Sequence, residues 1–200
     1  MTKSGLAISL SRLESFSDPK LMKEQYSTDS ETAADLLWFA YMQGDIETKV
    51  IADLGAGTGI LGIGCCLLGA KKCYLVENDP EAIISLKKNI EVMQIKNAEI
   101  VESDVASFAK KADAVVQNPP FGTKARHADR EFLEKAFSIA KVVYSLHKSS
   151  TRKFVEAIAK DRGFSITNRI KYMMPLKATH SFHRKKIQRI EVELYRLKSA

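Results

Sequence analysis

The segment Val50–Gly64, VIADLGAGTGILGIG, decides the fold class of this 200-residue chain. Its apolar start predicts a buried strand, and its apolar end predicts a helix. Between the two stand Gly55, Gly57 and Gly59, residues needed where a chain turns sharply and a ligand must approach the backbone closely. The segment therefore predicts a nucleotide-binding loop at the carboxyl end of a parallel strand.

Strands and helices alternate around this loop, which is typical of an α/β fold with a parallel sheet and helices on both faces. The last strand differs, because polar and apolar residues alternate strictly over 188–195. This alternation predicts an antiparallel strand at the end of the sheet, with one wet face, paired with a strand near 164–174. The other expected strands cover 50–54, 72–76, 98–101 and 112–116, and the helices that follow the loop cover about 60–69, 80–92, 129–142 and 150–161.

An N-terminal section precedes the sheet and contains two expected helices, near 9–23 and 30–43. Thr28 and Glu31 have the spacing of a capping box at the start of the second helix. With no repeat and no linker in the sequence, we expect one domain over residues 1–200. Its parts are a helical section at 1–45 and a cofactor-binding core at 46–200.

Composition excludes several classes of protein. A hydrophobic content of 45% fits an ordinary globular core, and no apolar run approaches the roughly 18 residues of a membrane span. Cys65, Cys66 and Cys73 lack a C-x-x-C spacing and indicate reduced thiols of a cytoplasmic protein. His180 and His183 form an H-x-x-H without a second ligand pair, so we expect no metal site.

The residues around the glycine loop favour S-adenosyl-L-methionine over a dinucleotide. Glu77 ends the next expected strand, where a carboxylate can accept both hydroxyls of an adenosine ribose. A dinucleotide enzyme places an acid there too, and Gly57-x-Gly59-x-x-Gly62 matches its pattern. Asp53 precedes the glycines, however, where it can hold the loop, and no cation stands nearby for a pyrophosphate. Asp104 stands where an adenine amino group could be bound, although a solvated loop aspartate fits that position equally well.

Asn118, Pro119, Pro120 and Phe121 follow the strand expected at 112–116 and form a stiff corner at the same edge of the sheet. The amide oxygen of Asn118 and the carbonyl of Pro119 can accept the two N–H bonds of an exocyclic amino group. Phe121 offers a face for stacking a planar base, worth about 1–3 kcal/mol. The corner therefore predicts methylation of an exocyclic amino nitrogen, with adenine N6 as the first candidate.

With these motifs, the chain resembles the methyltransferase-like protein 5 family of small-subunit ribosomal RNA adenine-N6 methyltransferases, in its archaeal form. The resemblance implies a Rossmann-like class I methyltransferase fold, with a mostly parallel seven-stranded sheet that ends in an antiparallel hairpin. It rests on Glu24-Gln25-Tyr26-x-Thr28, DLGAGTG at 53–59, NPPFGTK at 118–124, VYSLHKSST at 143–151 and SFHRKK at 181–186.

The resemblance also implies site residues and partners. Catalysis would lie at Asn118 through Phe121, the substrate would be small-subunit ribosomal RNA, and a small zinc-binding activator subunit would pair with the edge of the sheet. The cofactor-binding residues would be Gln25, Thr28, Gly55, Thr58, Ile60, Glu77, Asp104 and Val105, to which the loop pattern adds Asp53, Gly57 and Gly59.

Charge supports a polyanionic substrate, since 31 Lys and Arg stand against 24 Asp and Glu, a net charge of +7. Many cations lie in 148–189, including a basic segment that contains Phe182. Phosphate contacts with one stacked base would use such a segment, although a solvated charged loop fits it as well. The candidate RNA-binding residues are Lys124, Lys148, Arg184, Lys185 and Lys186.

Two other functions fit part of the pattern. A glutamine-N5 methyltransferase of a translation protein needs the same two acceptors, but usually has Tyr after the two prolines and a larger N-terminal domain. A catalytically idle RNA-binding subunit would not need Asn118 or an intact glycine loop. The chain has Phe121 and about fifty residues before the sheet, so RNA is the preferred substrate.

Overall fold

A seven-stranded sheet organises the computed structural model, which describes residues 1–15, 28–120, 128–176 and 188–199. The strand order is β3-β2-β1-β4-β5-β7-β6. Strands β1 to β5 are parallel, and β7 pairs antiparallel with both β5 and β6, as expected for a class I methyltransferase. The strands are β1 (Val50–Leu54), β2 (Lys72–Glu77), β3 (Ala98–Glu102), β4 (Ala114–Gln117), β5 (Val142–Lys148), β6 (Phe164–Leu176) and β7 (Gln188–Ser199).

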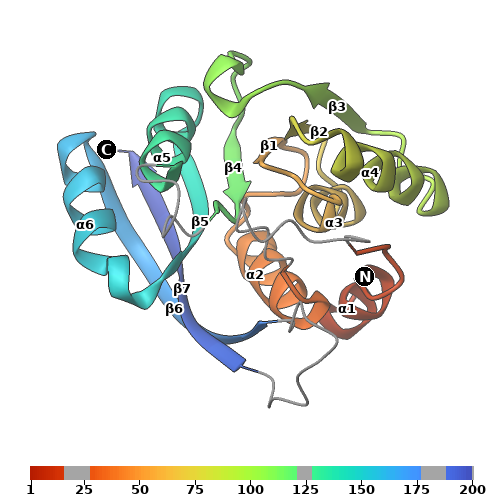
Figure 1. The fold of residues 1–200 in the computed structure, drawn as a ribbon, viewed down its shortest axis with the longest axis horizontal. Coiled ribbons are helices and arrows are strands. Elements are labelled where there is room, and N and C mark those ends of the chain that lie inside the picture. The colour runs from red at the N-terminus through yellow and green to blue at the C-terminus, as the bar shows by residue number, and fades with distance from the viewer. Residues whose placement is uncertain (16–27, 121–127, 177–187, 200) are drawn as a thin grey trace.

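Helices cover both faces of this sheet, as Figure 1 shows. One buried cluster joins the sheet to α1, α2, α3 and Leu86 of α4, and a second joins the opposite face to α5 and α6. The helices are α1 (Lys3–Leu10), α2 (Ser30–Met42), α3 (Ile60–Leu67), α4 (Pro80–Val92), α5 (Ala128–Ile139) and α6 (Arg152–Asp161), with short 3-10 turns η2 (Val105–Ser107) and η3 (Ser149–Thr151). None of the helices described is long and apolar enough to cross a membrane.

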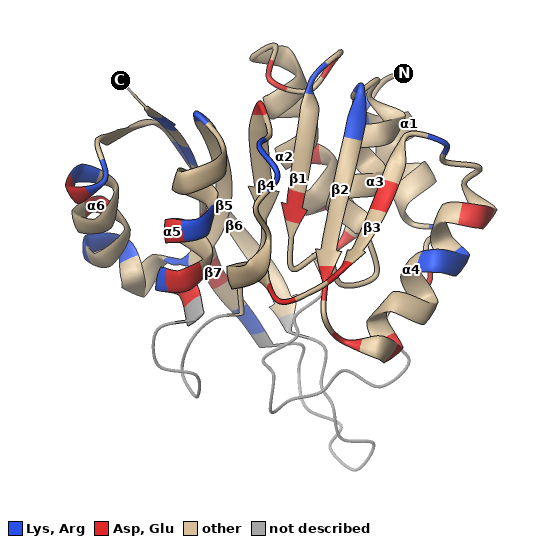
Figure 2. Cartoon of the chain, turned by 90° about the horizontal axis from the view of Figure 1, so that it is seen from above, with Lys and Arg blue, Asp and Glu red and all other residues tan. Residues whose placement is uncertain are grey.

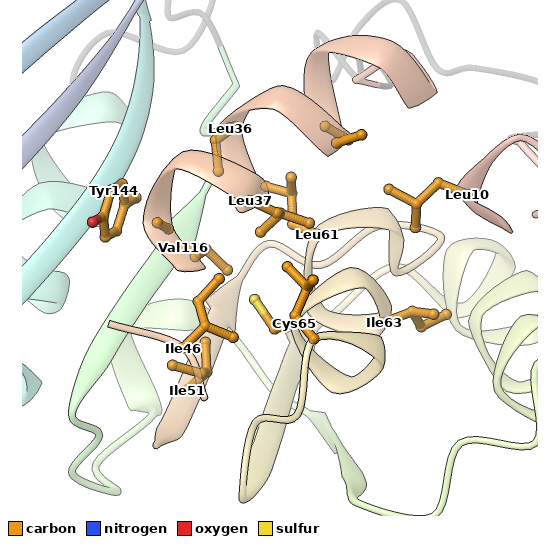
Figure 3. Close-up of a cluster of buried hydrophobic side chains, with 14 of the residues drawn as sticks. Leu10, Leu36, Leu37, Ile46, Ile51, Leu61, Ile63, Cys65, Val116 and Tyr144 are labelled. Atoms are coloured by element: carbon orange, nitrogen blue, oxygen red, sulfur yellow. The ribbon is translucent and has the colours of Figure 1, made fainter. Parts of the chain in front are cut away.

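The larger cluster ties the N-terminal section to the core. Leu37 of α2 lies beside Leu61 of α3, while Leu36 lies toward Val116 and Tyr144 of the sheet (Figure 3). The three cysteines expected as reduced thiols are free and buried. Truncating a fully buried leucine such as Leu37 would cost about 2–5 kcal/mol, so α2 is a structural part of this layer.

The start of the chain differs from the expectation. Helix α1 covers Lys3–Leu10 rather than 9–23, because the side chain of Thr2 accepts a hydrogen bond from Gly5 N (3.1 Å) and begins the helix early. Residues 16–23 of the expected helix lie outside the described residues. The capping box of Thr28 is also wrong, because the N-cap of α2 is Asp29, whose carboxylate accepts from the backbone N–H of Thr32 at 3.0 Å.

Strand β7 is not at the end of the sheet, contrary to the expectation, because β6 lies outside it. Its residues 192–197 are all buried, so the expected wet face does not exist there. Glu193 and Tyr195 were expected on that face and are both fully buried. The alternation misled because Glu193 carries its charge into the interior together with two partners, Arg152 and the hydroxyl of Tyr195.

Candidate active site

The glycine loop between β1 and α3 has the geometry that only glycine adopts easily. Gly55, Gly57 and Gly59 have φ angles of +70°, +56° and +94°, all in the left-handed region. The loop is also tightly covered: a Cβ on Gly55 would lie 2.8 Å from Phe132 Cε1, and one on Gly59 would lie 2.4 Å from Leu86 Cδ1. Any side chain at these two positions would therefore deform the loop.

Glu77 ends β2 beside this loop, and its carboxylate is held by backbone N–H groups. Oε2 accepts from Gly57 N at 2.7 Å, while Oε1 accepts from the N–H groups of Asn78 and Asp79, both at 2.9 Å. A carboxylate has about four acceptor sites and three are used here, so Oε2 can still accept a hydroxyl hydrogen bond. The structure thus brings Glu77 to the glycine loop in the position expected for a ribose-binding acid.

Asp53 restrains the glycine loop from the end of β1. The side chain is 1% exposed, and Oδ2 accepts from Gly62 N at 2.8 Å, which ties the end of β1 to the first turn of α3. Burial raises the pKa of Asp53 to about 7, and the negative charge of Glu77 adds to the effect. The expectation that Asp53 holds the loop therefore agrees with its contacts.

Asp104 and Val105 lie at the end of the neighbouring strand. The carboxylate of Asp104 accepts from Ala106 N at 2.8 Å, which caps η2, and from Asn78 Nδ2 at 3.1 Å. The backbone N–H of Asn78 donates to Glu77, so the acids at the ends of β2 and β3 are joined through one residue. Asp104 is exposed and Val105 is buried.

Asn118 follows β4, which pairs with β1 in the sheet, so the corner and the glycine loop leave neighbouring strands at the same edge. Its Nδ2 donates to Thr28 Oγ1 at 3.0 Å. Thr28 is 4% exposed and precedes α2, so the N-terminal section reaches the candidate catalytic residue. Pro119 is buried at the corner, with Pro120 half-buried after it. Phe121, Lys124 and Gln25 lie outside the described residues.

A buried polar chain lies next to the corner. Gln117 Nε2 donates to Ser145 Oγ at 2.9 Å, and Ser145 Oγ lies 2.7 Å from His147 Nε2. The Ser145 hydroxyl therefore joins Gln117 to His147, since a hydroxyl can accept one hydrogen bond and take part in a second. Burial lowers the pKa of His147 to about 3, so the ring is neutral. Ser145 and His147 both lie within the motif VYSLHKSST at 143–151, but no sequence pattern indicates their contact with Gln117.

Asn89 is a second residue that the sequence reading missed. It lies on α4, is 2% exposed, and donates from Nδ2 to Thr58 O at 2.8 Å and to Glu14 O at 3.0 Å. Its Oδ1 accepts from Glu14 N at 2.8 Å. The available signal was its place on the buried stripe of α4, three residues after Leu86, where a polar residue is unusual.

The candidate RNA-binding residues are only partly described. Lys148 ends β5 at the same edge and is half-buried, whereas Arg184, Lys185, Lys186, His180 and His183 lie outside the described residues. Figure 2 shows basic positions on α6 and acidic ones at the ends of β2 and β3. Several cations of the basic region have acidic partners: Arg152 with Glu193, Arg162 with Glu134, Arg169 with Glu156, and Lys171 with Glu191.

Comparison with known proteins decides the family. The model of the methyltransferase small domain matches residues 26–144. The zebrafish (Danio rerio) protein named rRNA N(6)-adenosine-methyltransferase METTL5 is 37% identical over 194 residues, with 94% of each chain covered. This chain belongs to the METTL5 family. A METTL5 relative from Drosophila melanogaster is 36% identical, with 94% of this chain and 92% of that protein covered.

A solved structure extends this likeness to the whole fold. The crystal structure of a candidate RNA methyltransferase from Pyrococcus horikoshii has a TM-score of 0.91 and 44% identity, and covers 99% of this chain and 98% of that one. As a METTL5-family enzyme, the chain is an S-adenosylmethionine-dependent methyltransferase. The family thus decides between the two cofactors that the glycine pattern allowed. The left-handed glycine loop and the oriented carboxylate of Glu77 fit S-adenosylmethionine.

Proposed function

We propose that this enzyme methylates N6 of an adenosine in small-subunit ribosomal RNA. The METTL5 relatives that span 94% of the chain are named as rRNA N6-adenosine methyltransferases. One observation in the structure carries the proposal: Asn118 leaves β4 beside the glycine loop, and Thr28 fixes its carboxamide. Because Nδ2 donates to Thr28, Oδ1 is the end of the carboxamide that would accept from an amino group.

The proposed chemistry depends on orientation. The lone pair of an adenine amino nitrogen is delocalised into the ring, so the nitrogen is a poor nucleophile. Asn118 Oδ1 and the carbonyl of Pro119 would accept its two N–H bonds and direct the lone pair, while Phe121 would stack on the base. S-adenosylmethionine, when bound, supplies an electrophilic methyl group. Alignment of the two groups then provides most of the rate.

No side chain near the corner needs to act as a strong base. The amino nitrogen becomes acidic only after methyl transfer, and water can take the proton. His147 is the nearest histidine to the corner among the described residues, but its ring is buried, neutral and bonded to Ser145. We therefore assign His147, with Gln117, to support of the corner and not to proton transfer.

The cofactor would lie along the carboxyl edge of β1, β2 and β3. Glu77 would bind the ribose hydroxyls, the glycine loop would receive the amino-acid end, and Asp104 with Val105 would contact the adenine. This placement has support from the contacts that join these groups, since Glu77 bonds to Gly57 and Asn78 bonds to Asp104. The remaining proposed cofactor contacts are Gln25, Thr28, Asp53, Gly55, Thr58, Gly59 and Ile60.

Substrate RNA would approach the same edge, where Lys148 ends β5, and be held by Lys124, Arg184, Lys185 and Lys186. A net charge of +7 favours such binding. We place the enzyme in the cytoplasm, which contains ribosomal RNA and whose reducing environment keeps thiols such as its three free cysteines reduced.

A small zinc-binding activator subunit is the proposed protein partner, bound by strand addition at β3. Strand β3 is one of the two edges of the described sheet, and unpaired edges favour such binding. Helix α4, which packs on β3, exposes Ile84 (68%) and Val92 (62%). This combination of an open edge and exposed apolar side chains supports β3 and α4 as the docking face.

Methylation of a defined RNA tests the proposed reaction. The purified enzyme, with S-adenosylmethionine and an RNA fragment from the ribosomal small subunit, should transfer methyl to one adenosine. The same fragment with inosine at that position should accept none, because inosine lacks the amino group. Transfer to a glutamine peptide, with none to any RNA, would overturn the RNA assignment and favour the amide-nitrogen alternative.

A further inference from the structure

Asn89 joins two parts of the chain that the sequence separates widely. Its carboxamide binds Thr58, in the glycine loop, and Glu14, in the N-terminal section 75 residues earlier. Three hydrogen bonds of 2.8–3.0 Å use both the oxygen and the nitrogen of one side chain that is 2% exposed. No other type of side chain of this size carries a donor and an acceptor in a fork of this kind.

The contact with Thr58 matters because of where that residue lies. Thr58 stands between Gly57 and Gly59, which both have left-handed backbones, and Gly57 N bonds to Glu77. Fixing the carbonyl of Thr58 fixes the peptide plane that joins Thr58 to Gly59. Asn89 thereby restrains the loop from the helix side, while Asp53 restrains it from the sheet side through Gly62.

The contact with Glu14 extends this restraint to the N-terminal section. Glu14 N and O both bond to Asn89, and the Glu14 carboxylate pairs with Lys88, the preceding residue of α4. Further along, Thr28 bonds to Asn118. The section is therefore connected to the glycine loop through Asn89, which Glu14 contacts, and bonded directly to Asn118 at Thr28.

We propose that Asn89 is a positioning residue for S-adenosylmethionine, which holds the glycine loop in its binding shape by tying Thr58 to Glu14. This inference rests on the proposed cofactor site at the loop. The Asn89 side chain is turned to Thr58 and Glu14, so its effect on the cofactor passes through the loop backbone. Its loss should weaken cofactor binding and leave the chemical step at saturating cofactor unchanged, because Asn118 and Thr28 are untouched.

Asn89→Ala, compared with Asn97→Ala, tests the proposal. Asn97 is a matched control, because its Nδ2 also donates to a backbone carbonyl, that of Ala70 at 2.6 Å, away from the loop. Calorimetry should show S-adenosylmethionine Kd raised about tenfold or more in Asn89→Ala and within about twofold of wild type in Asn97→Ala, the range expected for unpaired buried groups. The kcat at saturating cofactor should stay within about threefold of wild type in both.

A second pair of variants distinguishes the backbone hydrogen bond between Glu14 and Asn89 from the ion pair between the Glu14 carboxylate and Lys88. Glu14→Pro removes the N–H that Asn89 accepts and should raise the cofactor Kd; Glu14→Ala keeps that N–H, loses only the ion pair with Lys88, and should not. A cofactor Kd in Asn89→Ala equal to that of Asn97→Ala would overturn the inference. The proposed function would stand in that case if Asn118→Ala still abolished RNA methylation while wild type methylated RNA.

Discussion

Thr28 and Asn118 are 90 residues apart in the chain, yet a 3.0 Å hydrogen bond joins their side chains. No spacing rule connects the two, so the sequence could place each at the site but could not show that one orients the other. The same holds for Asn89 and Glu14. The glycine loop and the Asn-Pro-Pro corner were predictable because their chemistry needs particular residues next to one another. The side chains that hold them in place come from distant segments and carry no local pattern.

The hydroxyl of Thr28 should therefore matter for turnover. Thr28→Val keeps the shape of the side chain and removes the acceptor for Asn118 Nδ2, so the carboxamide can rotate away from its productive orientation. We expect kcat at saturating cofactor to fall about tenfold or more, consistent with a loss of about 1–3 kcal/mol, and Thr28→Ser to restore most of it. A Thr28→Val enzyme with wild-type kcat would show that Asn118 is held by other groups.

Asp53 should give the stability of the fold an unusual pH dependence. Its pKa is about 7 in the folded chain and 3.8 in the unfolded one, so between these values the unfolded state has released a proton that the folded state retains. The free energy of unfolding contributed by Asp53 is therefore highest below about pH 4, falls as pH rises to 7, and is fully lost above that. His147 has a folded pKa of about 3 and an unfolded pKa of 6.5, so its contribution to the free energy of unfolding rises as pH increases between these values.

The variant Asp53→Asn separates the pH effect of Asp53 from that of His147. His147 is present in both wild type and the variant, so its contribution cancels when the two are compared. Wild type should lose up to about 4 kcal/mol of unfolding free energy relative to Asp53→Asn between pH 4 and pH 8. Chemical denaturation at a series of pH values measures this difference. Two curves that run parallel over the whole range would mean that folding does not raise the pKa of Asp53.

At the scale of elements, the parallel part of the sheet was predictable and the hairpin only in part. Short, mostly apolar runs such as Val50–Leu54, followed by a glycine-rich turn, are typical of strands that are buried on both faces. Strand β7 looked half-exposed because Glu193 lies in it, and no sequence pattern reveals that Arg152 compensates a buried carboxylate. The place of β7 inside the sheet depends on that pairing and on the return of β6 to its outer side.

The edge strand β3 supports a prediction about the partner subunit. Substitution of both Ile84 and Val92 by glutamate should abolish co-purification of a small zinc protein from the native cell, because the exposed apolar face of α4 would become charged. Ile8→Glu is the control, since Ile8 is also exposed (58%) but lies on α1. If wild type, the double variant and Ile8→Glu all recover the partner equally, α4 is not part of the docking face.

At the scale of the molecule, the N-terminal section and the sheet share one core. Leu6 and Leu10 of α1 belong to the same buried cluster as Ile51 of β1 and Tyr144 of β5. We therefore propose that residues 1–200 fold as one domain, in which the section at 1–45 is needed for the site as well as for stability. The sequence predicted α2 correctly there and misplaced α1, and their contacts with the site depend on the tertiary fold.

The central claim is that this enzyme places N6-methyladenosine in small-subunit ribosomal RNA through Asn118. The most direct measurement is mass spectrometry of nucleosides from that RNA in cells that lack the gene, complemented with wild type or Asn118→Ala. We expect one N6-methyladenosine to be lost without the gene, restored by wild type, and not restored by Asn118→Ala. Unchanged N6-methyladenosine in cells without the gene, or full restoration by Asn118→Ala, would contradict the account.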